Sequence, residues 1–203
     1  MYKEIIFDYS ELSSYIGKET LDNHLIIYRN NLAKLNDLLN LVNYDYSYSM
    51  VDLINHIDIF PLSIRGEVLY YLSSILNHNL YFYNMSNNGY LVPVKTIAKD
   101  INKYFGNYNN FKDEFINKAL KLKGSGYTFL VRDDNGELEI INTSNEDSPY
   151  YYGMIPIIGL DLWEHAYFLE YMNNREDYIN NFFKVIDFNK INDYYERLLN
   201  DGT

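Results

Sequence analysis

A carboxylate and an imidazole that could share a metal ion stand four residues apart, at Asp161 and His165. The apolar run 155–160 leads into this pair, and an amphipathic segment follows it, so we expect a strand to end where the pair begins. A carboxylate oxygen with an imidazole nitrogen suits iron, manganese or zinc. The spacing alone leaves a second interpretation open, because such pairs also occur as solvated surface groups.

The remaining candidate ligands are histidines, since the chain has four histidines and no cysteine. Without cysteine, disulfides and zinc–thiolate sites are excluded, and any metal must be held by histidine and carboxylate side chains. His24 and His78 both fall in segments that are predicted to be helical. A lone histidine on the apolar face of a helix is more often a core residue than a ligand, so the pattern by itself decides neither role.

Two long helices are predicted in the N-terminal part of the chain. Between residues 18 and 41, apolar side chains recur every three or four positions, which is the period of one helix face. A second helical stretch covers about residues 63–85 and begins just after Pro61. A polar, turn-like segment separates the two, so we expect an antiparallel helical hairpin that carries His24 and His78.

A three-stranded sheet is predicted further along the chain. Asp133-Asp134-Asn135-Gly136 lies between the apolar runs 127–131 and 138–141, which is typical of a hairpin with Asn-Gly at its tip. The run 155–160 supplies the third strand. Helices are predicted before and after these strands, at about residues 94–104, 110–122, 175–185 and 191–199.

The predicted fold class is α+β in two domains. The clearest break in the chain is Ser86-Asn87-Asn88-Gly89. We therefore expect an N-terminal antiparallel helical-hairpin domain at residues 1–87 and a C-terminal α/β domain with a three-stranded antiparallel sheet at residues 88–203.

The composition excludes several classes of partner. The chain has 203 residues, 47% of them hydrophobic, and a formal net charge of -11. Its few lysines and arginines are scattered, which disfavours nucleic acid and anionic membranes as partners. No apolar window is long enough to span a bilayer, and the N-terminus lacks the features of a signal peptide, so we expect a soluble cytoplasmic protein. An anionic substrate would need a local positive field at the site.

The string Asp161-Leu162-Trp163-Glu164-His165-Ala166-Tyr167 closely resembles the D-x-W-E-H-A-Y signature of the iron/manganese superoxide dismutases. The resemblance extends over almost the whole chain. Asn77-His78 resembles the ligand motif N-H-x-x-F-W, and residues 124–131 resemble G-S-G-W-x-W-L-V.

The resemblance implies one manganese or iron ion per chain, held by His24, His78, Asp161 and His165. His56 matches no motif of the family. The metal would oxidise one superoxide to O₂ and then reduce a second one to H₂O₂, whereas zinc could occupy the site but could not change its oxidation state. Around the metal, the resemblance places Glu146, Trp163, Tyr28, Phe82 and Tyr127.

The resemblance also implies a homodimer. Glu164 would bind the ligand histidine, His165, of the partner subunit and so fix the tautomer of its imidazole. Tyr167 would bond across the interface to the residue at position 28, which is histidine in the family and Tyr28 in this chain.

Two substitutions near the expected metal depart from the family. Manganese-type members have Gln in an N-Q-D-S-P string, where this chain has Glu146; iron-type members place their Gln at the position of Ser74. The layout is therefore manganese-like, but with a carboxyl group in place of an amide. Leu32 replaces the family's Tyr, so we expect slower proton delivery.

Three alternatives remain for Glu146: an ionised acceptor that favours the oxidised metal, a neutral acid that donates a hydrogen bond, or a side chain in solvent. The substitutions at Glu146 and Leu32 also motivate an alternative function: the chain would be a metal-binding protein with the dismutase fold but with weak or altered redox activity. A protein without metal, acting only through structure or interaction, is disfavoured because all four expected ligands are present.

Overall fold

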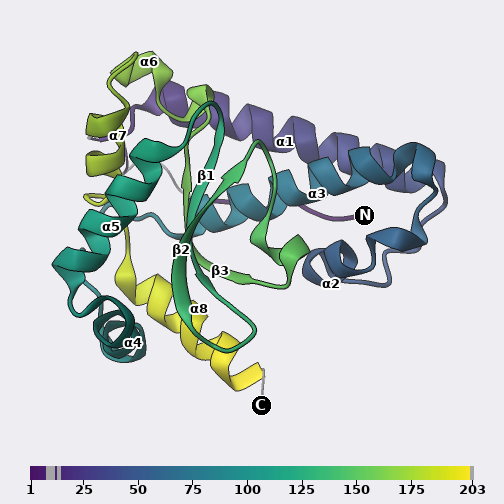
Figure 1. The fold of residues 1–203 in the computed structure, drawn as a ribbon. Helices are drawn as coiled ribbons and strands as arrows, with labels where there is room; N and C mark the ends of the chain where they lie inside the picture. Colours follow the sequence, from purple (N-terminus) through teal and green to yellow (C-terminus); the bar gives the residue numbers. More distant parts are fainter. Residues whose placement is uncertain (8–11, 13–14, 202–203) are drawn as a thin grey trace.

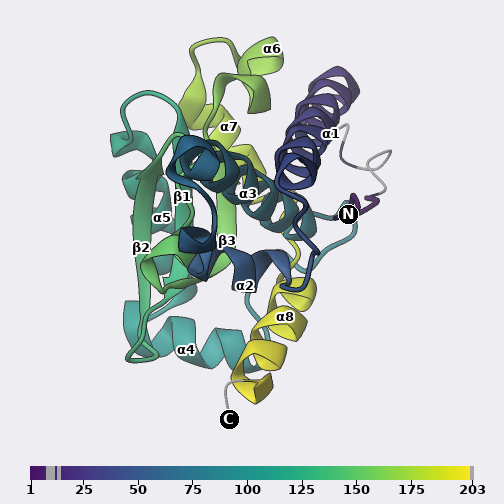
Figure 2. The ribbon, with the colours of Figure 1, turned by 90° about the vertical axis from the view of Figure 1, so that its right-hand side faces the viewer.

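The N-terminal part of the chain is a pair of long antiparallel helices, α1 (Lys18–Leu41) and α3 (Leu62–Tyr83). The structure, a computed structural model, describes residues 1–7, 12 and 15–201. The two helices lie side by side (Figures 1 and 2). They pack on each other along buried faces, and α3 also packs on β3, as the three-to-four-residue period predicts. The helical hairpin is therefore confirmed.

The connection between α1 and α3 contains structure that the sequence did not predict. A short helix, α2 (Met50–Asn55), and a single 3-10 turn, η1 (Ile57–Ile59), fill it. Ser49 caps α2, because its hydroxyl accepts a hydrogen bond from the backbone N–H of Asp52 at 3.1 Å. A helix of six residues is too short to show a helical period in the sequence.

The C-terminal part contains the expected three-stranded antiparallel sheet, with strand order β2-β1-β3. The strands are β1 (Gly126–Arg132), β2 (Leu138–Ser144) and β3 (Ile155–Asp161). The β1–β2 hairpin turns at Asn135-Gly136, where Gly136 takes the positive φ of +80° that favours glycine. The antiparallel pairing places Asp161 opposite Tyr127, at the end of β3 next to the start of β1.

Helices cover the sheet. Helices α4 (Lys95–Phe105) and α5 (Tyr108–Lys121) contact β2, and α5 also contacts β1; α3 and α8 (Phe188–Asp201) contact β3 (Figure 1). Helix α7 (Arg175–Phe182) packs on α5. All four predicted helices of this region are present within a few residues of their expected bounds. The fold class is thus α+β, as predicted, and the long N-terminal helices meet the sheet at β3.

Short elements follow the end of β3, which comes at Asp161 as expected. The chain forms a 3-10 turn, η3 (Glu164–Ala166), and the one-turn helix α6 (Phe168–Tyr171). A further 3-10 turn, η2 (Pro149–Tyr152), precedes β3. Within the ranges that the structure describes, no helix has the length and apolar character needed to cross a bilayer.

Candidate metal centre

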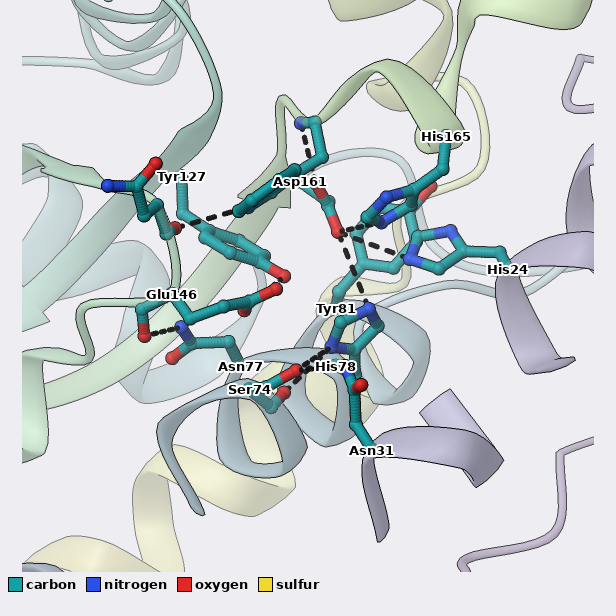
Figure 3. A network of polar contacts seen from close by, with 12 residues as sticks. His24, Asn31, Ser74, Asn77, His78, Tyr81, Tyr127, Glu146, Asp161 and His165 are labelled. Atoms are coloured by element: carbon teal, nitrogen blue, oxygen red, sulfur yellow. Dashed lines mark hydrogen bonds and ion pairs between the residues drawn. The ribbon is translucent and has the colours of Figure 1, made fainter. Parts of the chain in front are cut away.

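Four side chains from four different elements converge where the helical hairpin meets the sheet (Figure 3). They are His24 of α1, His78 of α3, Asp161 at the end of β3 and His165 in η3. One ligand atom from each lies within 4.8 Å of the others. The side chains of His24, His78 and Asp161 have no exposed surface, and that of His165 is 18% exposed. The arrangement is the one expected of a mononuclear metal site.

The atoms that face the centre of this cluster have no hydrogen-bond partner among the described residues. They are Asp161 Oδ2 and the Nε2 atoms of the three histidines. Oδ2 lies 3.1 Å from Nε2 of His24, 3.4 Å from that of His165 and 3.8 Å from that of His78. Unpaired buried polar atoms are costly, at about 1–3 kcal/mol each. A cation bound between three nitrogens and one oxygen satisfies all four, so the residues fit manganese or iron.

Neighbouring groups orient two of these ligands. The carbonyl oxygen of Ser74 lies 2.7 Å from Nδ1 of His78 and can only accept, so Nδ1 carries the proton and Nε2 keeps its lone pair. The other carboxylate oxygen of Asp161, Oδ1, accepts the backbone N–H of Trp163 at 2.8 Å. Oδ2 is thereby left for the metal.

The protonation states of these side chains suit metal binding, which requires neutral imidazoles and an ionised carboxylate. Burial lowers the pKa of His24, and it lowers the pKa of His78 to about 3, so both imidazoles are neutral near pH 7. Burial opposes the charge on Asp161, but contacts with the imidazoles of His165 and His24 hold the pKa of its carboxyl below the usual range. Asp161 is therefore an ionised ligand.

Aromatic side chains surround the ligands. The ring of Trp163 stacks on His165 with centroids 5.7 Å apart, and Phe82 meets His24 at 4.9 Å. Tyr127 lies 6.3 Å from His78. The family resemblance placed Trp163, Phe82 and Tyr127 around the metal. In the structure, all three lie next to the clustered ligand histidines.

Two tyrosines at the centre were not predicted from the sequence. The ring of Tyr81 lies 5.2 Å from that of His24, and its hydroxyl is 3.1 Å from the hydroxyl of Tyr178. Tyr178 in turn donates to the backbone oxygen of Asp161 at 2.8 Å. Tyr81 follows His78 by three residues on the same helix face, and that spacing is the signal that could have identified it.

Glu146 points inward and its side chain is buried. The residue is 3% exposed, and its Oε2 accepts a hydrogen bond from the Tyr127 hydroxyl at 3.1 Å. Asn77 holds the backbone, because its Nδ2 donates to the Glu146 carbonyl oxygen at 3.0 Å. Burial and the charge of Asp161 raise the pKa of Glu146 to about 8, against hydrogen bonds from Tyr127 and Ser74 that lower it. The side chain lies inside the protein and not in solvent.

Tyr28 is close to the ligands, but its hydroxyl is directed away from them. Its ring centroid is 6.2 Å from that of His78. The hydroxyl donates to Oδ1 of Asn79 at 2.8 Å and accepts the backbone N–H of Ile5 at 3.0 Å. Both contacts lie within the same chain, and Tyr28 is 1% exposed. Leu32, one turn further along α1, is buried at 7% exposure.

The two residues expected at a dimer interface lie beside His165. Glu164 is exposed, and its Oε2 accepts a hydrogen bond from the Ser125 hydroxyl at 2.7 Å. Tyr167 is 7% exposed and packs its ring on Tyr178. His56, by contrast, stacks on Tyr48 at the end of α2, and it is not one of the clustered ligands.

The raised pKa of Glu146 predicts how the stability of the metal-free protein depends on pH. A carboxyl whose folded pKa lies above its unfolded value stabilises the fold below the unfolded pKa, and this contribution is lost as pH rises through about 8. A pKa difference of one between the folded and unfolded states corresponds to about 1.4 kcal/mol. Between pH 5 and pH 9, the free energy of unfolding of Glu146→Gln should therefore rise relative to wild type by a few kcal/mol. Urea denaturation of both metal-free proteins measures this difference. If the difference in unfolding free energy between the two proteins stayed constant from pH 5 to pH 9, the raised pKa of Glu146 would be contradicted.

Comparisons with known proteins agree with this geometry. Residues 93–194 match the family described as "Iron/manganese superoxide dismutases, C-terminal domain". "Superoxide dismutase [Mn] 3" of Leptolyngbya boryana is 38% identical over 191 residues, covering 92% of this chain and 78% of the relative. "Superoxide dismutase [Mn]" of Listeria monocytogenes and "Superoxide dismutase [Mn/Fe] 2" of Staphylococcus aureus are each 35% identical, with 94% of both chains covered. The chain therefore belongs to the iron/manganese superoxide dismutase family.

Proposed function

We propose that this protein converts two superoxide ions and two protons into O₂ and H₂O₂, with one manganese or iron ion held by His24, His78, Asp161 and His165. The observation that carries this proposal is the convergence of four buried ligand atoms that have no other partner among the described residues. When bound, the ion supplies the one-electron redox change that each half of the reaction requires.

The ligands suit a metal that changes its charge. Asp161 contributes one negative charge, and the neutral imidazoles of His24 and His78 contribute none. A divalent or trivalent ion in this set leaves a small net charge in a buried site, so both states are tolerated. Manganese and iron have two accessible oxidation states, whereas zinc has no redox chemistry. The relatives' names include manganese. Glu146 stands where manganese-type members of the family have Gln, which agrees with those names.

The surrounding residues limit access to the metal. His24, His78 and Asp161 are enclosed, and the partly exposed ligand is His165, against which Trp163 stacks. We infer that superoxide approaches on the side of His165 and Trp163. With a net charge of -11, the protein does not attract an anion as a whole, so the charge of the metal itself provides the local attraction.

The departures at Glu146 and Leu32 keep a second function in consideration, that of a dismutase-fold metal protein with weak or altered redox activity. Metal analysis of protein from its native source, with dismutase activity measured on the same sample, separates the two. Metal at one equivalent per chain with strong activity supports the first function. The same metal content with little activity supports the second.

Replacement of a ligand tests the metal assignment. Asp161→Ala removes the charged ligand, so we expect loss of bound manganese or iron in elemental analysis and loss of dismutase activity. Asp193→Ala is a matched control, because Asp193 carries the same group on an exposed surface (its side chain is 64% exposed). One equivalent of metal retained in Asp161→Ala would overturn the ligand set.

The charge at position 146 should alter the midpoint potential. An ionised Glu146 beside Asp161 stabilises the oxidised metal, so Glu146→Gln should raise the potential with the same metal loaded. A difference of 1.4 kcal/mol equals about 59 mV for one electron. Because the pKa of Glu146 is raised to about 8, the rise should be larger at pH 9 than at pH 6. Asp147→Asn, an exposed neighbour, is the control. Equal potentials in wild type and Glu146→Gln at both pH values would exclude this role.

A homodimer remains a prediction of the family resemblance. A cytoplasmic location and the division of the chain after residue 87 remain predictions from the sequence. Support for the dimer is the surface hollow beside the metal, which His165 and Glu164 line together with Phe168 and Leu169. Phe168 and Leu169 are each 50% exposed, which leaves apolar surface next to a ligand.

Removal of the expected interface carboxylate tests the dimer. If Glu164 binds His165 of the partner subunit, Glu164→Ala should weaken the dimer and lower the metal content together. Sedimentation and elemental analysis measure the two effects, and Glu139→Ala on the exposed face of β2 is the control. A wild-type protein that is monomeric at micromolar concentration would remove the basis for this role.

A further inference from the structure

A surface pocket that the proposed function does not use lies between helices α2, α3 and α8. Its volume is about 480 Å³, within the range of about 300–1,000 Å³ that is typical of small-molecule sites. Its lining comes from five segments: the N-terminal segment, the start of α2, α3, η2 and α8. None of the four clustered metal ligands belongs to this lining, so the pocket is separate from the metal centre.

Hydrocarbon side chains form half of the lining. They are Ile5, Met50, Val51, Leu76, Leu80 and Leu198. Two of them leave much of their surface to solvent, since Ile5 is 47% exposed and Val51 is 38% exposed. Apolar surface that gathers in a concave site marks a place for ligand binding, because covering it with another apolar group is favourable. The lining therefore favours a ligand with a hydrocarbon body.

Arg197 is the one charged side chain among the described residues of this lining. Its Nε donates to the backbone oxygen of Asp193 at 3.2 Å, and its Nη2 donates to the hydroxyl of Tyr83 at 3.2 Å. These bonds hold the guanidinium in place from α8 and from α3. A guanidinium has five N–H donors, so most of them remain, and within the described part of the chain Arg197 forms no ion pair. The group is oriented and still able to bind an anion.

The phenol groups of the pocket are already paired within the protein. Tyr83 and Tyr194 donate to backbone oxygens at 3.2 and 3.3 Å. The hydroxyl of Tyr150 lies 2.9 Å from that of Tyr194, and it is the donor because Tyr194 gives its own proton to the backbone. All three phenol protons are thus used, and the charged donors of Arg197 remain for a ligand.

We propose that this pocket binds a small amphipathic monocarboxylate. The carboxylate pairs with the end of the Arg197 guanidinium, where two parallel N–H donors match its two oxygens. The hydrocarbon body covers Val51, Leu76 and Leu80. A single cation in a chain with a net charge of -11 suits one negative charge and disfavours a polyanion. This binding site goes beyond the proposed function and does not depend on it.

Two residues of the lining also hold Tyr28 beside the metal centre. The backbone N–H of Ile5 donates to the Tyr28 hydroxyl at 3.0 Å, and Oδ1 of Asn79 accepts from it at 2.8 Å. The ring centroid of Tyr28 is 6.2 Å from that of His78. A ligand seated in the pocket therefore lies against the residues that fix Tyr28.

Titration calorimetry of the metal-loaded protein with octanoate tests the proposal. Octanamide, with the same chain length and no charge, is the matched probe. Octanoate should bind once per chain and about fivefold or more tightly than octanamide, as expected for one solvent-accessible charge pair with two hydrogen bonds. Arg197→Gln should abolish this preference. Lys99→Gln removes the same charge from the exposed face of α4, outside the lining, and should keep it.

A second variant tests the apolar part of the site while Arg197 stays in place. Val51→Trp adds a large side chain at a partly exposed position, so it fills the pocket without repacking the core. Both probes should bind at least about tenfold more weakly to it, because the apolar contact is lost. Octanoate should also slow hydrogen exchange in residues 1–7 and 76–83 of the wild type and leave it unchanged in Val51→Trp.

Three outcomes would overturn the proposal. They are absence of octanoate binding at millimolar concentration, equal affinities of the wild type for octanoate and octanamide, and unweakened binding of octanoate to Val51→Trp. Sedimentation tests a different occupant. Association of the chain that octanoate reverses and that Val51→Trp abolishes would assign the pocket to a second copy of the protein instead.

Discussion

The fold depends on holding one ionised carboxylate, Asp161, fully buried among imidazoles. An isolated buried charge is very costly, so this arrangement is favourable only with a cation that pairs with it. The ligands come from α1, α3, β3 and η3, and the ion therefore joins the helical hairpin to the sheet. Any ligand that binds only the folded state adds to its stability by mass action. Metal binding and the packing of the two halves of the chain are consequently parts of one equilibrium.

Much of this arrangement could be predicted from the sequence because its signals are local. The long apolar periods of α1 and α3 and the Asn-Gly hairpin between β1 and β2 each reflect the residues within one element. The ligands on the two helices carried no such signal by themselves. His24 and His78 became candidates because longer motifs in the chain resemble those of the family. By itself, a histidine on the apolar face of a helix gives the same sequence pattern whether it is a core residue or a metal ligand.

The features that the sequence did not predict depend on contacts between elements. Tyr28 lies one turn from His24, but its hydroxyl is directed to Asn79 and Ile5, which belong to other segments. Whether Glu146 lies in solvent or in the core likewise depends on Asn77 of α3, which anchors the backbone of the loop from a position 69 residues away. Short elements such as α2 and η3 contain too few residues to show a period.

The substitutions at Glu146 and Leu32 both concern groups that exchange protons. Reduction of superoxide to H₂O₂ consumes two protons, and the buried hydrocarbon of Leu32 cannot carry either of them. Asn31, the residue before it, lies seven positions from His24 and so on the same helix face, and it turns its amide to Ser74.

Groups near the ligands that carry exchangeable protons include the hydroxyls of Ser74, Tyr81, Tyr127 and Tyr178 and the carboxyl of Glu146. A carboxyl with a pKa near 8 gains and loses protons close to neutral pH, which an amide cannot do. Glu146 therefore places a group that can exchange a proton close to the clustered ligands, which the hydrocarbon side chain of Leu32 cannot do.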